Sequence, residues 1–197
     1  MNVKHINRRT FVAGSVAAGF ALLPVRAAPP IDKLADIAAR ELARAGSKVW
    51  LKDRVAIADF SLPSSVPRFY LVDMAGGAVK SFLVTHGKGS DPEHLGIVQN
   101  FSNEIGSAAT SRGAYVTTKW YDGTHGPSMR LLGLDPDNSN AEDRAIVIHA
   151  AAYANPAMIG KWGKLGRSDG CFAFPDANLM EILARLSPGR LLFADRL

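Results

Sequence analysis

Cysteine is almost absent from this sequence, which holds a single one, Cys171, among 197 residues. A lone cysteine cannot form a bridge within its own chain, so Cys171 is a structural residue, half of an intermolecular disulfide or a reactive thiol. Charged and aromatic residues are also moderate, at 21% and 8% of the chain, beside 47% hydrophobic residues. Such values exclude collagen-like, disordered and multi-span membrane proteins, and they fit one globular domain whose core needs no disulfide.

The sequence also lacks a basic stripe of the kind that binds nucleic acid, although its formal net charge is +5. The excess comes from Lys4, Arg8, Arg9 and Arg26, because the first 27 residues hold no acid. These four belong to the 23 lysines and arginines of the chain, so 19 basic residues face 18 acidic ones in the rest. Phosphate binding requires clustered lysines and arginines, so we expect no nucleic-acid partner.

The basic residues at the start belong to a predicted export signal over residues 1–27. A basic segment precedes an apolar run, residues 11–23, and Val25-Arg26-Ala27 presents small residues where a signal peptidase cuts. Arg8 and Arg9 are the paired arginines of a twin-arginine signal. We therefore expect the twin-arginine export machinery as a partner.

The apolar run is too short for a comfortable membrane span, which takes about 20 residues. We expect cleavage after Ala27 and no stable membrane span afterwards, with an uncleaved N-terminal anchor as the alternative. The expected product is a bacterial protein in the periplasm or elsewhere outside the cytoplasm, with a single domain over residues 28–197.

Residues 28–197 are expected to be mainly β with short helices. Apolar residues at helical spacing predict a helix from residue 31 to residue 46, and alternating or β-branched patterns predict strands. These strands cover residues 55–60, 68–74, 79–86, 114–120, 129–134, 145–149 and 191–194, with a hairpin turn at 75–78. Two further helices are predicted near the C-terminal end, the first capped by Asn155 and the second by Asp176. This order favours a β-sandwich or a partly open barrel.

A long polar segment, residues 87–113, has neither a helix nor a strand pattern and is rich in glycine, serine and asparagine. Loops of this length in a compact domain are usually functional or mobile. A lid over a functional site is therefore one hypothesis for this segment, beside a substrate groove and a plain loop.

Candidate chemistry concentrates in His149 and, 22 residues later, Cys171. His149 ends the apolar segment 145–148, which places its imidazole at the rim of a buried strand. Cys171 follows Gly170, where the backbone can turn tightly and present a thiol together with N–H groups. A thiol is mostly protonated at neutral pH, and a nearby histidine is its usual activating base. The alternative is a buried spacer cysteine and a hydrogen-bonded histidine without catalytic function.

The residues around these two candidates resemble the active-site signature of the L,D-transpeptidases, a histidine followed at a distance by Ser-x-Gly-Cys. His149 and the segment Gly166-Arg167-Ser168-Asp169-Gly170-Cys171 resemble that signature. Further motifs resemble those of the murein L,D-transpeptidase catalytic domain family, which is related to YkuD-like enzymes. These motifs lie at residues 60–64, 84–90, 101–103, 111–117 and 121–126, and the resemblance covers residues 59–175.

The resemblance implies an L,D-transpeptidase-like fold and a cysteine acyltransferase that acts on tetrapeptide stems of peptidoglycan. Cys171 is then the nucleophile, and His149 is the general base and acid. No metal or cofactor is implied. The remaining expected site residues are Gly170 and Ser168 in the oxyanion loop, and Arg167, His86 and Asp169 in substrate binding.

Two positions depart from the pattern of the wider superfamily. Ala150 stands where a glycine follows the histidine, and Ala173 stands where an arginine occurs two residues after the cysteine. We expect Arg167 to supply the missing guanidinium. An L,D-carboxypeptidase with water as acceptor and a non-catalytic peptidoglycan-binding module with a degenerate site are the alternative functions. His125 is expected to be a loop residue, with the mouth of the cleft as its alternative position.

Overall fold

The computed structural model describes residues 27–197. The predicted export signal lies outside that range except for Ala27, so its cleavage and its twin-arginine character stay predictions. Within the range, no helix is both long enough and apolar enough to cross a membrane.

Eight strands form a single mixed sheet in the order β3-β2-β1-β8-β4-β5-β6-β7. Neighbours are antiparallel except where β1 pairs with β8 and where β6 pairs with β7. The strands are β1 (Arg54–Asp59), β2 (Phe69–Asp73), β3 (Val79–Phe82), β4 (Gly113–Gly123), β5 (Gly126–Gly133), β6 (Val147–Ala150), β7 (Phe172–Phe174) and β8 (Leu191–Asp195).

The sheet curls so far that its two edges approach each other. Phe69 of β2 and Phe174 of β7 meet edge to face with ring centroids 4.8 Å apart, although five strands lie between β2 and β7 in the sheet. The chain after β3 also lies next to β7, because Thr85 N–H donates to Ala173 O of β7 (3.0 Å). The predicted class, mainly β with short helices in a partly open barrel, is therefore confirmed.

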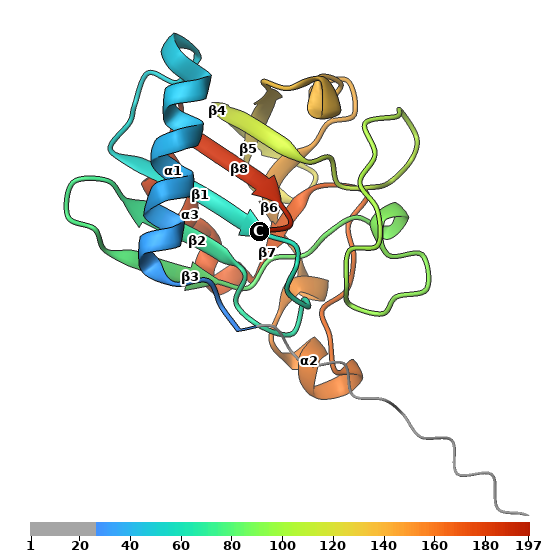
Figure 1. The fold of residues 1–197 in the computed structure, drawn as a ribbon. Helices are drawn as coiled ribbons and strands as arrows, with labels where there is room; N and C mark the ends of the chain where they lie inside the picture. The colour runs from blue at the N-terminus through green and yellow to red at the C-terminus, as the bar shows by residue number, and fades with distance from the viewer. Residues whose placement is uncertain (1–26) are drawn as a thin grey trace, which may run out of the picture.

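Two helices cover opposite faces of the sheet, as Figure 1 shows for α1 (Ile31–Ala45) in front and α3 (Asp176–Leu186) behind. Side chains alternate along a strand, so each strand serves both faces. In β1, Val55 and Ile57 join the apolar cluster under α1, whereas Ala56 and Ala58 join the cluster with α3. The helical residues that fill the α3 side are Leu179, Ile182, Leu183 and Leu186.

The remaining helical segments are short. The helix predicted after Asn155 is α2 (Ala157–Trp162), which buries none of its residues. The predicted caps are wrong, because neither α2 nor α3 has a side-chain hydrogen bond at its N-terminus. Asn155 Nδ2 instead donates to Asp176 Oδ2 (3.1 Å), so the two predicted caps bind each other. Single 3₁₀ turns are η1 (Gly46–Lys48), η2 (Lys88–Ser90), η3 (Pro136–Asn138) and η4 (Ala152–Ala154).

Candidate active site

Cys171 and His149 lie on the parallel pair formed by β6 and β7. Cys171 immediately precedes β7, and His149 is the third residue of β6, opposite Ala173. Because side chains alternate along a strand, His149 and Cys171 are on the same face of this pair. The structure therefore brings the predicted nucleophile and base to one place.

The thiol of Cys171 is half-buried and donates to Ala145 O (3.5 Å). Within residues 27–197 no hydrogen bond joins it to His149. Ala145 has a φ of 50°, in the left-handed region that costs a non-glycine residue about 1 kcal/mol. Such a conformation turns the chain just before β6 and aims the Ala145 carbonyl at the thiol. The thiol hydrogen therefore points to the Ala145 carbonyl and not to the imidazole of His149.

The imidazole of His149 is nearly buried, with 2% of its surface exposed, and its tautomer follows from one contact. Its Nδ1 lies 2.8 Å from Ala150 O, and a carbonyl only accepts, so Nδ1 carries the hydrogen. Burial lowers the pKa of His149, the Ala150 carbonyl opposes this effect, and His125 adds to the lowering. The ring is therefore neutral at pH 7, with the lone pair on Nε2 available to accept a proton.

His125 stacks on His149. It lies in the turn between β4 and β5, as expected for a loop residue, and the two rings are 4.4 Å apart with an interplanar angle of 23°. Its alternative position, at the mouth of the cleft, stays a prediction. Stacking restricts the rotation of the His149 ring and places a second titratable group against it.

The thiol itself is not activated in the resting structure. Burial raises the pKa of Cys171, and the negative charge of Asp169 acts in the same direction. The N–H of Val147 and the guanidinium of Arg144 oppose the shift without cancelling it. The site therefore holds a neutral thiol and a neutral imidazole at pH 7.

Ser168 and Gly170 shape the turn before the nucleophile. Ser168 Oγ donates to Cys171 O (2.7 Å) and accepts from Gly170 N–H (3.2 Å). Gly170 has a φ of 119°, and a Cβ there would lie 2.7 Å from Ala109 O, so only glycine fits. The oxyanion role of Gly170 and Ser168 stays a prediction, and in this structure the Gly170 N–H is engaged within the turn.

The residues expected to bind substrate lie at different depths. Asp169 is exposed and forms an ion pair with Lys88 (2.7 Å between Nζ and Oδ1). Arg167 Nη1 donates to the backbone oxygens of Asp91 and Pro92, the latter at 3.0 Å. His86 is fully buried. The substrate-binding roles of all three stay predictions, and Arg167 in this structure holds the segment around Asp91.

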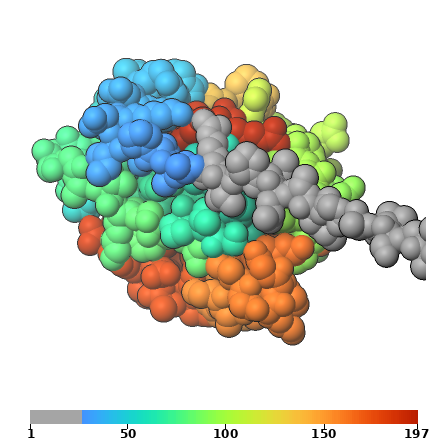
Figure 2. Space-filling model, turned by 60° about the horizontal axis from the view of Figure 1, so that its bottom comes forward, coloured from blue at the N-terminus to red at the C-terminus, as the bar shows by residue number. Residues whose placement is uncertain are grey.

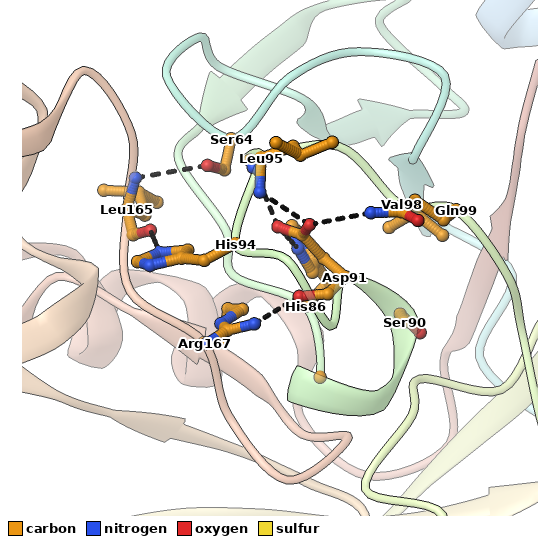
Figure 3. A network of polar contacts seen from close by, with 12 residues as sticks. Ser64, His86, Ser90, Asp91, His94, Leu95, Val98, Gln99, Leu165 and Arg167 are labelled. Atoms are coloured by element: carbon orange, nitrogen blue, oxygen red, sulfur yellow. Dashed lines mark hydrogen bonds and ion pairs between the residues drawn. The ribbon is translucent and has the colours of Figure 1, made fainter.

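The His86 ring belongs to a buried polar network that Figure 3 shows around Asp91. Its Nε2 lies 3.1 Å from Asp91 Oδ2 and its Nδ1 lies 2.6 Å from Arg68 Nη2. Burial and the Arg68 charge lower the pKa of His86 to about 3, and burial lowers the pKa of Arg68 to about 9. Asp91 also accepts from the N–H groups of Leu95 and Gly96 (2.7 Å each). The network thus closes the start of the 87–113 segment into a fixed turn.

Segment 87–113 forms one wall of the site. Lys88 N–H donates to Ser168 O (2.7 Å), and Thr110 Oγ1 donates to Gly170 O (3.3 Å). Both contacts reach the residues directly before the nucleophile. The segment is therefore built into the site, and a lid movement stays a hypothesis.

The helix α2 and the residues after it, up to Leu165, pack against the chain near Ser64 and His94. Figure 2 shows this part of the chain, in orange, against residues near position 60, in teal. Leu165 N–H donates to Ser64 Oγ (3.1 Å) at this boundary, and His94 Nε2 lies 2.9 Å from Leu165 O. Both the N–H and the carbonyl of Leu165, in the segment that leads to Cys171, are thus hydrogen-bonded to other parts of the chain.

Two residues near the thiol were not predicted from the sequence. Arg144, from the turn before β6, lies against Gly170. Tyr153 is also close: burial raises the pKa of its phenol, and the charges of Cys171 and Asp169 add to the shift. Neither residue belongs to a recognisable motif, so only their position in the fold reveals them. Within residues 27–197, no three His, Cys, Asp or Glu side chains are arranged to hold a metal ion.

A thiol and an imidazole on neighbouring parallel strands define a cysteine–histidine site in a mainly β domain. Residues 32–194 match the family model described as the L,D-transpeptidase catalytic domain. The chain belongs to this family. A comparison with curated proteins found no significant match.

Solved structures with a similar fold include several L,D-transpeptidases. One from Mycobacterium smegmatis is 13% identical, with 73% of this chain and 58% of that chain covered and a TM-score of 0.44. L,D-transpeptidase 3 from Mycobacterium tuberculosis is also 13% identical, with 73% and 61% covered and a TM-score of 0.47. A helical cell shape determining protein from Campylobacter jejuni is 13% identical, with 80% and 54% covered and a TM-score of 0.44. The chain spans less than two thirds of each of these proteins.

Proposed function

We propose that this protein is a cysteine L,D-transpeptidase that acts on tetrapeptide stems of peptidoglycan. The observation that carries the proposal is the placement of Cys171 and His149 on one face of the β6–β7 pair in a chain of this family. The hydrogen bond from His149 Nδ1 to Ala150 O supports it, because it leaves Nε2 as the proton acceptor.

The proposed reaction is an acyl transfer in two halves. Cys171 Sγ attacks the carbonyl carbon of the third stem residue, in the amide bond to the terminal D-Ala. The thiol proton passes to His149 Nε2. The tetrahedral intermediate collapses to a thioester as the bond to D-Ala breaks, and His149 returns the proton to the leaving amine. The amine of a second stem then attacks the thioester, forms the new amide and releases the thiol.

Two finer points belong to the same proposal. The acceptor is an amine of a second stem, whereas water as acceptor would make the protein an L,D-carboxypeptidase. The enzyme acts outside the cytoplasm, where peptidoglycan lies, because residues 1–27 have the pattern of a twin-arginine export signal. A peptidoglycan-binding module without turnover is the competing function, and Ala150 and Ala173 favour it.

Mass spectrometry of purified tetrapeptide muropeptides incubated with the protein tests this proposal. We expect loss of D-Ala together with a new cross-linked dimer, and neither product with Cys171→Ala. Tripeptide without dimer identifies the carboxypeptidase. Unchanged substrate in both samples, or equal turnover by the alanine variant, overturns the cysteine mechanism.

A further inference from the structure

Arg144 supplies a cation beside the nucleophile from a part of the chain that the sequence pattern does not single out. It lies in the turn before β6, and its guanidinium reaches across to the 87–113 segment. Nη1 donates to Ser102 O (2.7 Å) and to Ser111 Oγ (2.6 Å), and Nη2 donates to Ala109 O. Acceptors on the segment thus hold the guanidinium in one orientation.

The same guanidinium touches the turn that presents the thiol. A Cβ on Gly170 would lie 3.2 Å from Arg144 Nη2 and 2.7 Å from Ala109 O. Gly170 therefore packs directly on the contact between Arg144 and Ala109. Cys171 is the next residue, and Ala145, the neighbour of Arg144, accepts the hydrogen bond from its thiol (3.5 Å). Two consecutive residues thus contact the turn of the nucleophile: Arg144 places its charge against Gly170, and Ala145 offers its carbonyl to the thiol of Cys171.

The other cations of the site make their contacts away from Gly170 and Cys171. Arg167 Nη1 donates to the backbone of Asp91 and Pro92, and Lys88 is paired with Asp169. Ala173, at the position two residues after the cysteine, is completely buried and carries no charge. Arg144 is half-buried, so its charge is less screened than that of Lys88 at the surface.

We propose that Arg144 is the cation that positions the turn of Cys171 and stabilises its thiolate during acyl transfer. The inference rests on the proposed function, since a thiolate develops only if Cys171 is the nucleophile. In this assignment the guanidinium near the nucleophile comes from Arg144 and not from Arg167. It replaces the arginine that the wider superfamily has at the position of Ala173. The direction of the Cys171 pKa agrees, because Arg144 is a cation that opposes the effects of burial and of Asp169.

The test measures the rate of iodoacetamide alkylation against pH, which requires no substrate and no turnover. Cys171 is the only cysteine of the chain, so the rate reports on this thiol alone. The groups that face it are His149, Tyr153, Asp169 and Arg144. Arg144→Met keeps a long side chain but removes the charge. Arg144→Lys keeps the charge but removes the planar guanidinium group.

We expect Arg144→Met to slow alkylation at pH 7 by ~10-fold and to move the pH profile about one unit upward, because one pKa unit is a tenfold change in thiolate. Arg144→Lys is expected to stay within about threefold of the wild-type rate, because it retains the charge. The matched control is Arg112→Met, which removes an exposed arginine that is paired with Asp137. It is expected to leave the profile unchanged.

A wild-type profile in folded Arg144→Met overturns the proposal. Equal slowing by Met and Lys also overturns it, because the effect would then come from lost packing and not from charge. If Arg144→Met does not fold, Arg144→Lys decides, and a profile displaced by a full pH unit in the folded lysine variant contradicts the assignment. Failure of transpeptidation with normal alkylation profiles would instead count against the proposed function alone.

Discussion

At the scale of single residues, both reacting groups are neutral at rest. Burial raises the pKa of Cys171 and lowers the pKa of His149, so the pair does not exist as thiolate and imidazolium at pH 7. In the proposed mechanism the proton therefore moves as the sulfur attacks, with His149 as the general base. A resting thiol is also less prone to oxidation than a thiolate, since the thiolate is the reactive form.

We expect His125 to influence the pH below which kcat/KM falls. In the proposed mechanism His149 accepts a proton only while it is neutral, so activity is lost as pH falls through its lowered pKa, below 6.5. His125→Phe keeps a stacked ring but removes the charge of His125 that lowers the pKa of His149. The pKa of His149 then rises, and we expect the acid limb of kcat/KM to move to higher pH by up to about one unit, with activity at pH 8 within about threefold of wild type.

The comparison variant is His125→Ala, which removes both the charge and the stacking. It is expected to shift the acid limb in the same way and to lower kcat at pH 8 as well, because the His149 ring then keeps its hydrogen bond to Ala150 O but loses the stacked ring that restricts its rotation. An acid limb that stays in place in His125→Phe would show that the two rings do not interact electrostatically.

The turn before the nucleophile requires glycine at position 170. Gly170→Ala would bring a Cβ to 2.7 Å from Ala109 O at a φ of 119°. We expect at least a tenfold loss of turnover, because misplacing the nucleophile by about 1 Å can cost 10²-fold. Gly163→Ala is the control, since Gly163 also has a positive φ, 73°, but nothing lies within 4 Å of its added Cβ. It is expected to reduce stability by about 1 kcal/mol and to leave turnover unchanged.

At the scale of elements, α3 supports the strands that carry the site. Leu183 of this helix is completely buried in the same apolar cluster as Ile148 of β6 and Phe172 of β7. Leu183→Ala is expected to lower the free energy of unfolding by about 2–5 kcal/mol, because it removes apolar contacts and leaves a cavity. Urea unfolding followed by circular dichroism measures the change.

The same helix offers a matched control. Met180 is 55% exposed, so Met180→Ala removes a similar side chain from the surface and is expected to change stability by no more than about 0.5 kcal/mol. Equal destabilisation by the two substitutions would contradict the placement of α3 on the sheet.

Most elements could be predicted from local patterns, and the exceptions have physical causes. The helix over residues 31–46 corresponds to α1 (Ile31–Ala45). Alternation predicted β1, and β-branched and aromatic residues predicted β2 and β3. Strand β7 (Phe172–Phe174) was missed because three residues are too few for a periodic pattern. The predicted caps failed because Asn155 and Asp176 bind each other, a contact that depends on the tertiary fold.

At the scale of the whole molecule, the site joins segments that are distant in sequence. Cys171 and His149 could be singled out as candidates because both match parts of one sequence signature. Arg144, and the stacking of His125 on His149, were not predictable, because these contacts exist only once β4, β5, β6 and β7 lie side by side. The same holds for the buried contact of His86 with Asp91, which no local pattern encodes.

That buried contact predicts how the stability of the molecule depends on pH. The pKa of His86 is about 3 in the folded protein, whereas the ordinary value of 6.5 applies to the unfolded chain. Between these values the unfolded chain binds a proton that the folded protein excludes, so stability falls as pH decreases. We expect the free energy of unfolding to change little between pH 7 and pH 8 and to fall by up to about 1.4 kcal/mol per pH unit between pH 6 and pH 4.

Urea unfolding at a series of pH values measures this slope, and a variant assigns it. His86→Gln removes the titratable group while an amide can still accept from Arg68 and donate to Asp91. The variant is expected to be less stable than the wild type at pH 7 and to have a flatter slope between pH 6 and pH 4. His94→Gln, a substitution of a half-buried histidine in the same segment, serves as the control and is expected to keep the wild-type slope. An unchanged slope in His86→Gln would mean that other buried groups, such as His149, dominate the acid sensitivity.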